Sequence, residues 1–223
     1  MIRNGIDVSE HQGSIDWEKV KGKIDFAILR AGYGRYIEQK DSQFERNYAE
    51  CKRLGIPCGA YWYSYAGSVE EAKEEARICL QILKGKKFDY PVYFDVEEPK
   101  PLNSGKVNDI IVAFGKAIEE AGFFAGLYMS RSPLTTYVSK NVQGRFTLWI
   151  AEYNSKCNYS GDYGMWQKSS GGTIEGIEGH VDLNECYKDY PKIINKEPEK
   201  ITKQVTLIID DHKYSGLLTE DLI

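Results

Sequence analysis

The stretch Phe88–Pro99, FDYPVYFDVEEP, decides the fold prediction for this chain. Its apolar and polar residues alternate and many are β-branched or aromatic, so it is expected to form a strand between two prolines. Asp95 and Glu97 are two residues apart, which places both on one face near the carboxyl end of that strand, with Glu98 just beyond. Repulsion between two such carboxylates raises the pKa of one and leaves the other ionised, which suits general acid catalysis. The alternative to a catalytic pair is an acidic strand end that is only solvated. Carboxylates also gather in ion-pair networks that have a purely structural role.

The composition fits one domain that binds a ligand with flat apolar faces. The 223 residues, of which 42% are hydrophobic, match the length of a single α/β barrel or sandwich. The chain carries 16 Tyr and 4 Trp, and this many rings suit a sugar chain as ligand, although core packing is expected to use most of them. The net charge of −4 and the lack of a Lys/Arg block argue against nucleic acid and anionic membranes as partners.

Cysteine usage and the first residues bear on the cellular compartment. The five cysteines are odd in number and form no CxxC motif, which excludes a complete disulfide framework and gives no sign of a zinc cluster. The opening MIRNGIDVSEHQG contains no apolar signal-peptide core, and no stretch approaches the roughly 18 apolar residues of a membrane span. We therefore expect synthesis in the cytoplasm without a signal peptide, and no insertion into a membrane.

Strand and helix patterns alternate over the first part of the chain. Strands are expected at 5–10, 25–34, 57–66, 88–99 and 123–130. Apolar positions spaced by three and four residues predict helices between them, with N-terminal caps from Ser42 with Glu45 and from Ser68 with Glu71. A further helix is expected after a cap at Ser132. Alternation of this kind predicts a parallel sheet.

The pattern changes in the last part of the predicted sheet. Strands are expected at 146–153, 163–169 and 180–187, but the segments between them are only about ten residues long and rich in Gly, Asn and Ser. Such segments are too short and too polar for a parallel crossover, which needs about a dozen residues and usually a helix. Eight strands suffice to close a barrel. The predicted fold class is therefore α/β, a modified TIM-like barrel with five βα units followed by three strands without helices.

Closure of such a barrel makes its first and last strands neighbours. Asp7 on the first strand would then meet Asp182 on the eighth. Catalytic residues of α/β barrels lie at the carboxyl ends of the strands, where Asp95 and Glu97 are also expected. Four carboxylates from three strands are thus predicted to converge on one mouth.

Taken together, the motifs resemble those of the glycoside hydrolase family 25 lysozymes, the Chalaropsis-type N-acetylmuramidases of bacteria and phage endolysins. The matching stretches run from Gly5 to Tyr187 in the family's order: GIDVSEHQG, RAGYG, GAYWYSYA, FDVEEP, LWIAEYN, MWQ and VDLNECY. The resemblance implies that the enzyme hydrolyses the β-1,4 bond between N-acetylmuramic acid and N-acetylglucosamine in bacterial peptidoglycan and so lyses the cell wall. It also implies that Glu97 is the general acid. The acids placed by the resemblance around the sugar C1 and its 2-acetamido group are Asp95, Asp7 and Asp182.

For the mechanism we favour assistance by the substrate. The 2-acetamido oxygen would attack C1, Asp95 or Asp182 would stabilise the positive charge, and Glu97 would protonate the leaving oxygen and later activate water. A pair of carboxylates acting directly, with retention or inversion, is the alternative, because strand geometry does not fix the distance between their oxygens.

Side chains near the predicted strand ends are candidate sugar platforms or hydroxyl donors, although about half of the rings are expected to serve packing. The candidate substrate-binding residues are Tyr33, Tyr61, Tyr63, Tyr128, Trp149, Tyr153 and Gln167. Arg30, inside an apolar strand, must be paired if it is buried. An internal ion pair is therefore expected for Arg30 rather than contact with substrate.

Two other classes of function fit parts of the sequence. A metal-dependent polysaccharide deacetylase or phosphoesterase would use the same four acids as Mg²⁺ or Ca²⁺ ligands. A metal-free acid cluster is preferred, so no metal and no cofactor are expected. A non-catalytic wall-binding module would keep the aromatic residues but would not need Glu97.

The resemblance ends after Pro191, so we expect a catalytic barrel over residues 1–191 and a separate tail over 192–223. Residues 196–203 are expected to be a linker. A hairpin is then expected from two strands and a polar turn, at 204–209, 214–218 and 210–213. An isolated hairpin is marginally stable in water, so the tail is expected to pack on the barrel, to self-associate with another chain or to target the wall. Release to the wall would need a holin-type pore or lysis of the cell.

Overall fold

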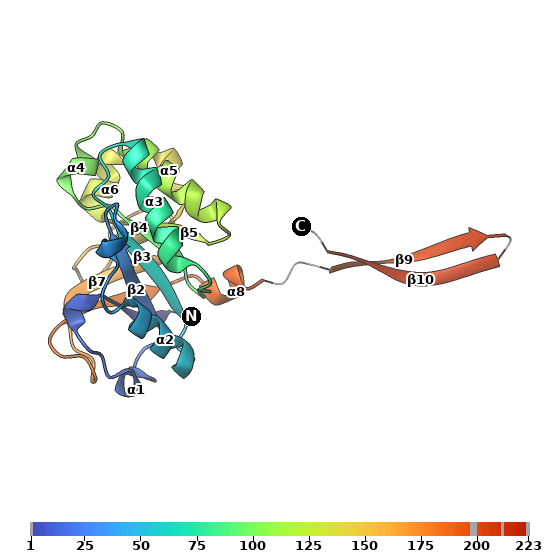
Figure 1. The fold of residues 1–223 in the computed structure, drawn as a ribbon, viewed down its shortest axis with the longest axis horizontal. Helices are drawn as coiled ribbons and strands as arrows, with labels where there is room; N and C mark the ends of the chain where they lie inside the picture. Colours follow the sequence, from blue (N-terminus) through green and yellow to red (C-terminus); the bar gives the residue numbers. More distant parts are fainter. Residues whose placement is uncertain (1, 197–199, 211, 222–223) are drawn as a thin grey trace.

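The chain builds a closed barrel of eight strands that follow one another in sequence order (Figure 1). The computed structural model describes residues 2–196, 200–210 and 212–221. The barrel strands are β1 (Arg3–Val8), β2 (Phe26–Tyr33), β3 (Cys58–Tyr63), β4 (Val92–Asp95), β5 (Ala125–Ser130), β6 (Thr147–Ala151), β7 (Met165–Gly172) and β8 (Val181–Cys186). The predicted modified barrel is therefore confirmed.

Helices follow each of the first five strands and lie outside the barrel (Figure 1). They are η1 (Glu10–Gln12), α1 (Trp17–Val20), η2 (Ile37–Gln39), α2 (Phe44–Leu54), α3 (Val69–Leu83), α4 (Pro99–Leu102), α5 (Val107–Glu120), α6 (Arg131–Tyr137) and α7 (Lys140–Gln143), with α8 (Tyr190–Ile194) after β8. Among the described residues no helix lies between β6 and β8, as predicted. Helix α6 begins at Arg131, before the cap predicted at Ser132.

The starts of α2 and α3 test the predicted helix caps. Helix α3 begins at the predicted Ser68 cap, whereas the Ser42 cap of α2 is wrong. The Oδ1 of Asp41 accepts a hydrogen bond from the Gln43 N–H at 2.9 Å. The Ser42 hydroxyl instead donates to Glu10 Oε2 at 2.8 Å, because a charged carboxylate is the stronger partner.

Strand β4 is shorter than predicted and ends at Asp95. Glu98 follows closely as the residue before α4, whose first residue is a proline with fixed backbone geometry. Glu97 therefore lies beyond the strand, in the segment that leads to this helix. The prediction that Asp95 and Glu97 share one face of the same strand is therefore wrong.

The strands are parallel from β1 to β7, and β8 is antiparallel to both β7 and β1. The prediction that no parallel crossover follows β6 is wrong. Residues 152–164 lead to a parallel β7 without a helix. A parallel connection needs about 12 residues, and this segment just reaches that length. Closure makes Asp7 and Asp182 register partners, as predicted.

Aromatic rings fill the barrel interior toward the end where the strands begin. Phe26 and Tyr90 stack with ring centroids 4.5 Å apart, and Tyr93 meets Trp149 edge-on at 5.1 Å. Gly126 on β5 leaves space for the Tyr93 ring, since a Cβ at this position would overlap it. A second apolar cluster packs between the strands and the helices. These layers hold the carboxyl ends of the strands in fixed positions.

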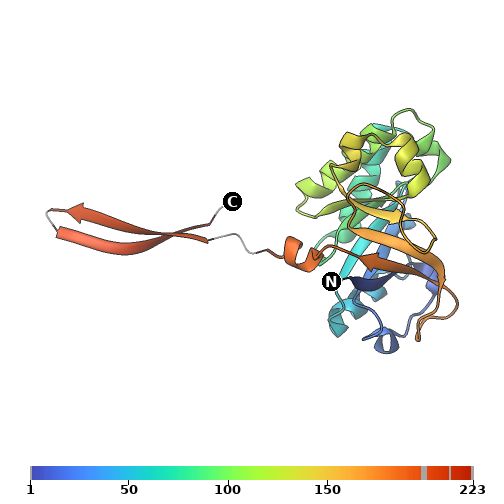
Figure 2. The same cartoon turned by 180° about the vertical axis from the view of Figure 1, so that it is seen from behind.

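After α8 the chain forms an antiparallel hairpin of β9 (Lys200–Ile209) and β10 (His212–Asp221). It lies away from the barrel, beyond α8, in both views (Figure 1, Figure 2). The predicted hairpin is confirmed and is longer than expected, because backbone pairing continues to Lys200 opposite Asp221. The last residues of the predicted linker 196–203 thus belong to β9, and 197–199 lie outside the described residues. The predicted boundary after residue 191 falls within α8, and the division into two domains stays a prediction.

Candidate active site

The carboxyl ends of the strands surround a pocket of about 260 Å³, which we call the acid pocket. It is lined by Asp7, His11, Arg30, Tyr61, Tyr63, Asp95, Glu97, Tyr128, Trp149, Tyr153, Gln167 and Asp182. The structure thus brings together every candidate site residue from the sequence except Tyr33. Tyr33 lines an adjoining pocket of about 400 Å³, which shares His11, Arg30 and Tyr63 with the acid pocket.

The four acids lie at different depths in the pocket. Asp7 and Asp95 are each 5% exposed, whereas Glu97 and Asp182 are half-buried. Among the described residues, the Oδ1 of Asp95 is buried without a hydrogen-bond partner. Glu97 is therefore the outer acid of the pair that it forms with Asp95, the last residue of β4, and a ligand in the pocket can reach it.

Burial raises the pKa of all four carboxyl groups and is the largest cause in each case. The charge of Asp182 further raises the pKa of Asp7, and the charge of Glu97 further raises the pKa of Asp95. For Glu97, a hydrogen bond with Tyr128 opposes the rise in pKa, while the charge of Asp182 adds to it. Repulsion within the Asp95–Glu97 pair thus acts on the deeper acid. The cluster keeps protons to a higher pH than isolated carboxyl groups do, as a general acid requires.

Two buried amides fix the carboxyl group of Asp7. Asn184 Nδ2 and Gln167 Nε2 both donate to Asp7 Oδ2, at 2.7 and 2.9 Å. Asn184 Oδ1 in turn accepts from Trp149 Nε1 at 2.8 Å. Both amides favour the charged form of Asp7 and so oppose the rise in its pKa. Asp7 is therefore held in one orientation by strands β7 and β8.

Gln167 also connects two tyrosines of the pocket. Its Oε1 accepts from the hydroxyls of Tyr128 at 2.8 Å and Tyr153 at 3.0 Å. Gln167, Tyr128 and Trp149 are 3%, 6% and 1% exposed, so most of their surface contacts other side chains. Tyr153 is 59% exposed and Tyr61 is partly open, which leaves their rings accessible to a ligand.

Arg30 forms internal ion pairs, as its place in an apolar strand predicts. Its Nε lies 2.7 Å from Asp41 Oδ2, and its Nη2 lies 2.7 Å from Glu10 Oε1. The side chain of Arg30 is 10% exposed. Two carboxylates thus neutralise the guanidinium, and Arg30 lines both of the adjoining pockets.

Several residues of the site were not predicted from the sequence. Asn184 could have been found, because it lies two residues after Asp182 and shares its strand face. Glu98 accepts a hydrogen bond from the Tyr63 hydroxyl at 2.7 Å, and Tyr65, 41% exposed, lines the adjoining pocket. No sequence signal connects these last contacts, because they depend on how the loops fold.

The chemistry of the pocket is that of carboxyl groups, amides and phenols. Within residues 2–196, 200–210 and 212–221, no group of three or more His, Cys, Asp or Glu is arranged to hold a metal ion. In the same part of the chain, no helix has the length and apolar character needed to cross a membrane.

Comparison with known proteins identifies relatives of this barrel. Residues 6–177 match the model of the glycosyl hydrolases family 25. The chain is 29% identical over 194 residues to the uncharacterized protein YegX of Escherichia coli K12, covering 81% of this chain and 68% of YegX. It is 27% identical over 183 residues to an autolytic lysozyme of Clostridium acetobutylicum, covering 81% of this chain and 55% of that lysozyme. The modular autolysin LytC of Streptococcus pneumoniae, solved with a synthetic peptidoglycan ligand, is 29% identical with a TM-score of 0.75, covering 83% of this chain and 47% of the LytC chain.

These matches establish the family of the chain. This chain spans about half the length of the autolytic lysozyme and of LytC. The family model covers more than half of the chain and includes Asp7, Asp95 and Glu97, while Asp182 follows the matched residues. The chain therefore belongs to family 25 of the glycosyl hydrolases, the lysozyme family that its motifs resemble.

Proposed function

We propose that the chain hydrolyses peptidoglycan at the β-1,4 bond between N-acetylmuramic acid and N-acetylglucosamine, and that this cleavage lyses the bacterial cell wall. The observation that carries the proposal is the position of Glu97 in a pocket lined by aromatic residues. Glu97 is half-buried, lies farther out than the buried Asp95 and has a raised pKa. The family match and the peptidoglycan ligand of LytC support the choice of substrate.

The depth of each acid suggests its role. Glu97, the outer and half-buried acid, protonates the glycosidic oxygen as the bond between that oxygen and C1 breaks. The 2-acetamido oxygen of the sugar attacks C1, and the carboxyl group of Asp95 or Asp182 stabilises the positive charge of the cyclic intermediate. Water then attacks C1 as the bond between C1 and the acetamido oxygen breaks, and it gives its proton to the Glu97 carboxylate, which restores the acid.

The fixed orientation of Asp7 suits the same scheme. Its Oδ2 accepts from two amides, and a hydrogen bond between its carboxyl group and that of its strand partner Asp182 raises the pKa of Asp7. We assign Asp7 to positioning Asp182 and the 2-acetamido group rather than to proton transfer. Tyr61, Tyr63 and Tyr153 supply the accessible rings and hydroxyls for the sugar faces.

Mass spectrometry of purified peptidoglycan after digestion tests the proposal. We expect fragments with N-acetylmuramic acid at the reducing end and no new free amino groups. Fragments with reducing-end N-acetylglucosamine would show cleavage of the other glycosidic bond. Release of acetate would instead favour the deacetylase alternative, and unchanged peptidoglycan with retained binding would favour a wall-binding module.

A further inference from the structure

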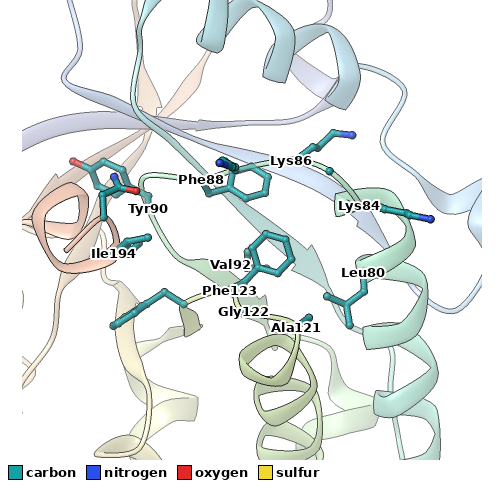
Figure 3. Close-up of a pocket in the computed structure, with 14 residues that line it drawn as sticks. Leu80, Lys84, Lys86, Phe88, Tyr90, Val92, Ala121, Gly122, Phe123 and Ile194 are labelled. Atoms are coloured by element: carbon teal, nitrogen blue, oxygen red, sulfur yellow. The ribbon is translucent and has the colours of Figure 1, made fainter. Parts of the chain in front are cut away.

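The adjoining pocket opens directly beside the acid pocket. Its volume is about 400 Å³, and His11, Arg30 and Tyr63 line both pockets. Another pocket, of about 490 Å³, lies instead at the opposite end of the barrel, where the strands begin, around Leu80 and Phe123 (Figure 3). A ligand chain that extends out of the acid pocket can therefore enter the adjoining pocket but not the one at the far end.

Three tyrosines shape the adjoining pocket. The ring centroids of Tyr63 and Tyr65 are 5.3 Å apart, and the ring of Tyr65 meets that of Tyr33 edge-on at 6.2 Å. Tyr65 is 41% exposed, and Tyr33 is partly exposed. The three rings thus form a corner of apolar faces with hydroxyl groups at the edges. Such a surface suits a sugar ring, which also has apolar faces and hydroxyl edges.

Contacts within the protein hold the three tyrosines in place. Tyr33 and Tyr63 are register partners at the ends of β2 and β3. The Tyr63 hydroxyl donates to Glu98 at 2.7 Å, and the Tyr65 N–H donates to the buried Glu75 at 2.9 Å. The rings are therefore positioned before a ligand binds, which lowers the entropic cost of binding.

The charged residues of the adjoining pocket are paired with one another. The Nε of Arg30 lies 2.7 Å from Asp41, its Nη2 lies 2.7 Å from Glu10 Oε1, and its Nη1 lies 3.3 Å from His11 Nε2. The other oxygen of Glu10 accepts from the Ser42 hydroxyl at 2.8 Å. Burying a charged group is costly unless the group finds a partner. An uncharged sugar is therefore favoured over a stem peptide, whose free ends carry charges.

The order of sugars in peptidoglycan identifies the ring that this pocket receives. In the proposed reaction, N-acetylmuramic acid lies at the acids, and the leaving sugar is bonded to the oxygen that Glu97 protonates. The leaving sugar must therefore lie against Glu97, which is not among the residues that line the adjoining pocket. The adjoining pocket thus lies on the other side of the N-acetylmuramic acid. There the alternating glycan carries N-acetylglucosamine, which has no lactyl group and no stem peptide.

We propose that the adjoining pocket binds the N-acetylglucosamine ring on the non-reducing side of the cleaved N-acetylmuramic acid, with Tyr33 and Tyr65 as its platform. This assignment rests on the proposed function and adds a determinant of specificity to it. The enzyme then prefers bonds inside a glycan chain to a bond that follows an N-acetylmuramic acid at the non-reducing end.

Two peptide-free oligosaccharides that differ by this one ring test the proposal. The first is the tetrasaccharide of two N-acetylglucosamine–N-acetylmuramic acid units, and the second is the trisaccharide that lacks the first N-acetylglucosamine. Both contain the same single bond for cleavage. We expect kcat/KM of the wild type to be about tenfold higher for the tetrasaccharide. Tyr65→Ala should bring the ratio of the two values close to one. Tyr137→Ala is the matched control and should keep the wild-type ratio, because Tyr137 is 42% exposed and lines neither pocket.

Calorimetric titration of the Glu97→Gln variant with the same two sugars measures the preference as a ratio of dissociation constants, without turnover. A ratio near one in both measurements would overturn the proposed pocket and leave the proposed hydrolysis intact. A clear binding preference without cleavage by the wild type would support the pocket and refute the hydrolysis. If Tyr65→Ala weakens the binding only of oligosaccharides that carry stem peptides, the occupant is the peptide and the proposal is wrong.

Discussion

The buried carboxyl group of Glu75, on helix α3, should make the stability of the barrel depend on pH. Glu75 is fully buried, and its Oε1 accepts a hydrogen bond from the Tyr65 N–H at 2.9 Å. Its Oε2 has no hydrogen-bond partner among the described residues. Burial raises the pKa of Glu75 from 4.5 to about 7. At about 1.4 kcal/mol for each pKa unit, this shift means that burial disfavours the charged form of Glu75 by about 3 kcal/mol relative to the neutral form.

The direction of the pH dependence follows from the protonation state of Glu75 that the folded chain prefers. A raised carboxyl pKa means that the folded chain favours the protonated acid, so its contribution to stability is complete below pH 4.5 and is lost as the pH rises to about 7. Glu75→Gln keeps an acceptor for the Tyr65 N–H and cannot ionise. The free energy of unfolding of the variant, relative to wild type, should therefore increase by about 3 kcal/mol between about pH 4 and about pH 8.

Urea unfolding followed by tryptophan fluorescence at the two pH values measures this difference. Glu74→Gln is the matched control, because Glu74 lies next along α3 and makes an exposed pair with Arg77 at 2.6 Å. Its effect should stay below about 1 kcal/mol and be nearly the same at both pH values. A Glu75→Gln effect that does not change with pH would refute the argument that burial sets the pKa of this group.

Four further predictions concern the acid pocket. Glu97→Gln keeps the shape of the side chain and removes its transferable proton, so turnover of peptidoglycan should fall by about 10² to 10⁴-fold while co-sedimentation with cell walls is retained. Asp95→Asn removes the acid whose pKa responds to the charge of Glu97, so turnover should fall while the alkaline limb of kcat/KM, set by Glu97, stays at the same pH, and a limb that moves to lower pH would show that Asp95 also raises the pKa of Glu97. Asn184→Ala removes hydrogen bonds to Asp7 and Trp149, so the free energy of unfolding should fall by about 1 to 3 kcal/mol and kcat should fall with it. Excess EDTA should leave the rate of hydrolysis unchanged, whereas a loss restored by Mg²⁺ or Ca²⁺ would favour the metal-dependent alternative.

The topology could be predicted because it follows from local patterns and one closure rule. Each strand carries its own apolar or aromatic pattern, and eight strands suffice to close a barrel. Closure then makes Asp7 and Asp182 neighbours although they are far apart in the sequence. The sequence was less informative where the length of a connection was close to the minimum for a parallel crossover. Residues 152–164 have just enough length for such a crossover without a helix.

The contacts of individual side chains could not be predicted in the same way. The sequence implies that Arg30 needs a partner, but its partners Glu10 and Asp41 lie in loops whose positions depend on the folded barrel. Gln167 and Trp149 stand in motifs that suggested contact with sugar, yet both are almost fully buried. Periodicity indicates which face of a strand a residue occupies, but how deeply its side chain is buried depends on the neighbouring loops and aromatic rings.

Depth also separates the two acids at the end of β4, Asp95 and Glu97, which strand alternation alone could not rank. A strand reaching Glu97 would give both acids the same orientation and similar burial. The strand instead ends at Asp95, and Glu97 lies farther out in the segment before α4. The inner acid therefore bears the greater burial and the added repulsion, and its protonation responds to the charge of the outer one. A proton donor must reach the glycosidic oxygen, and of this pair only Glu97 combines a raised pKa with a partly exposed side chain, so the early end of β4 underlies the roles that we propose for the two acids.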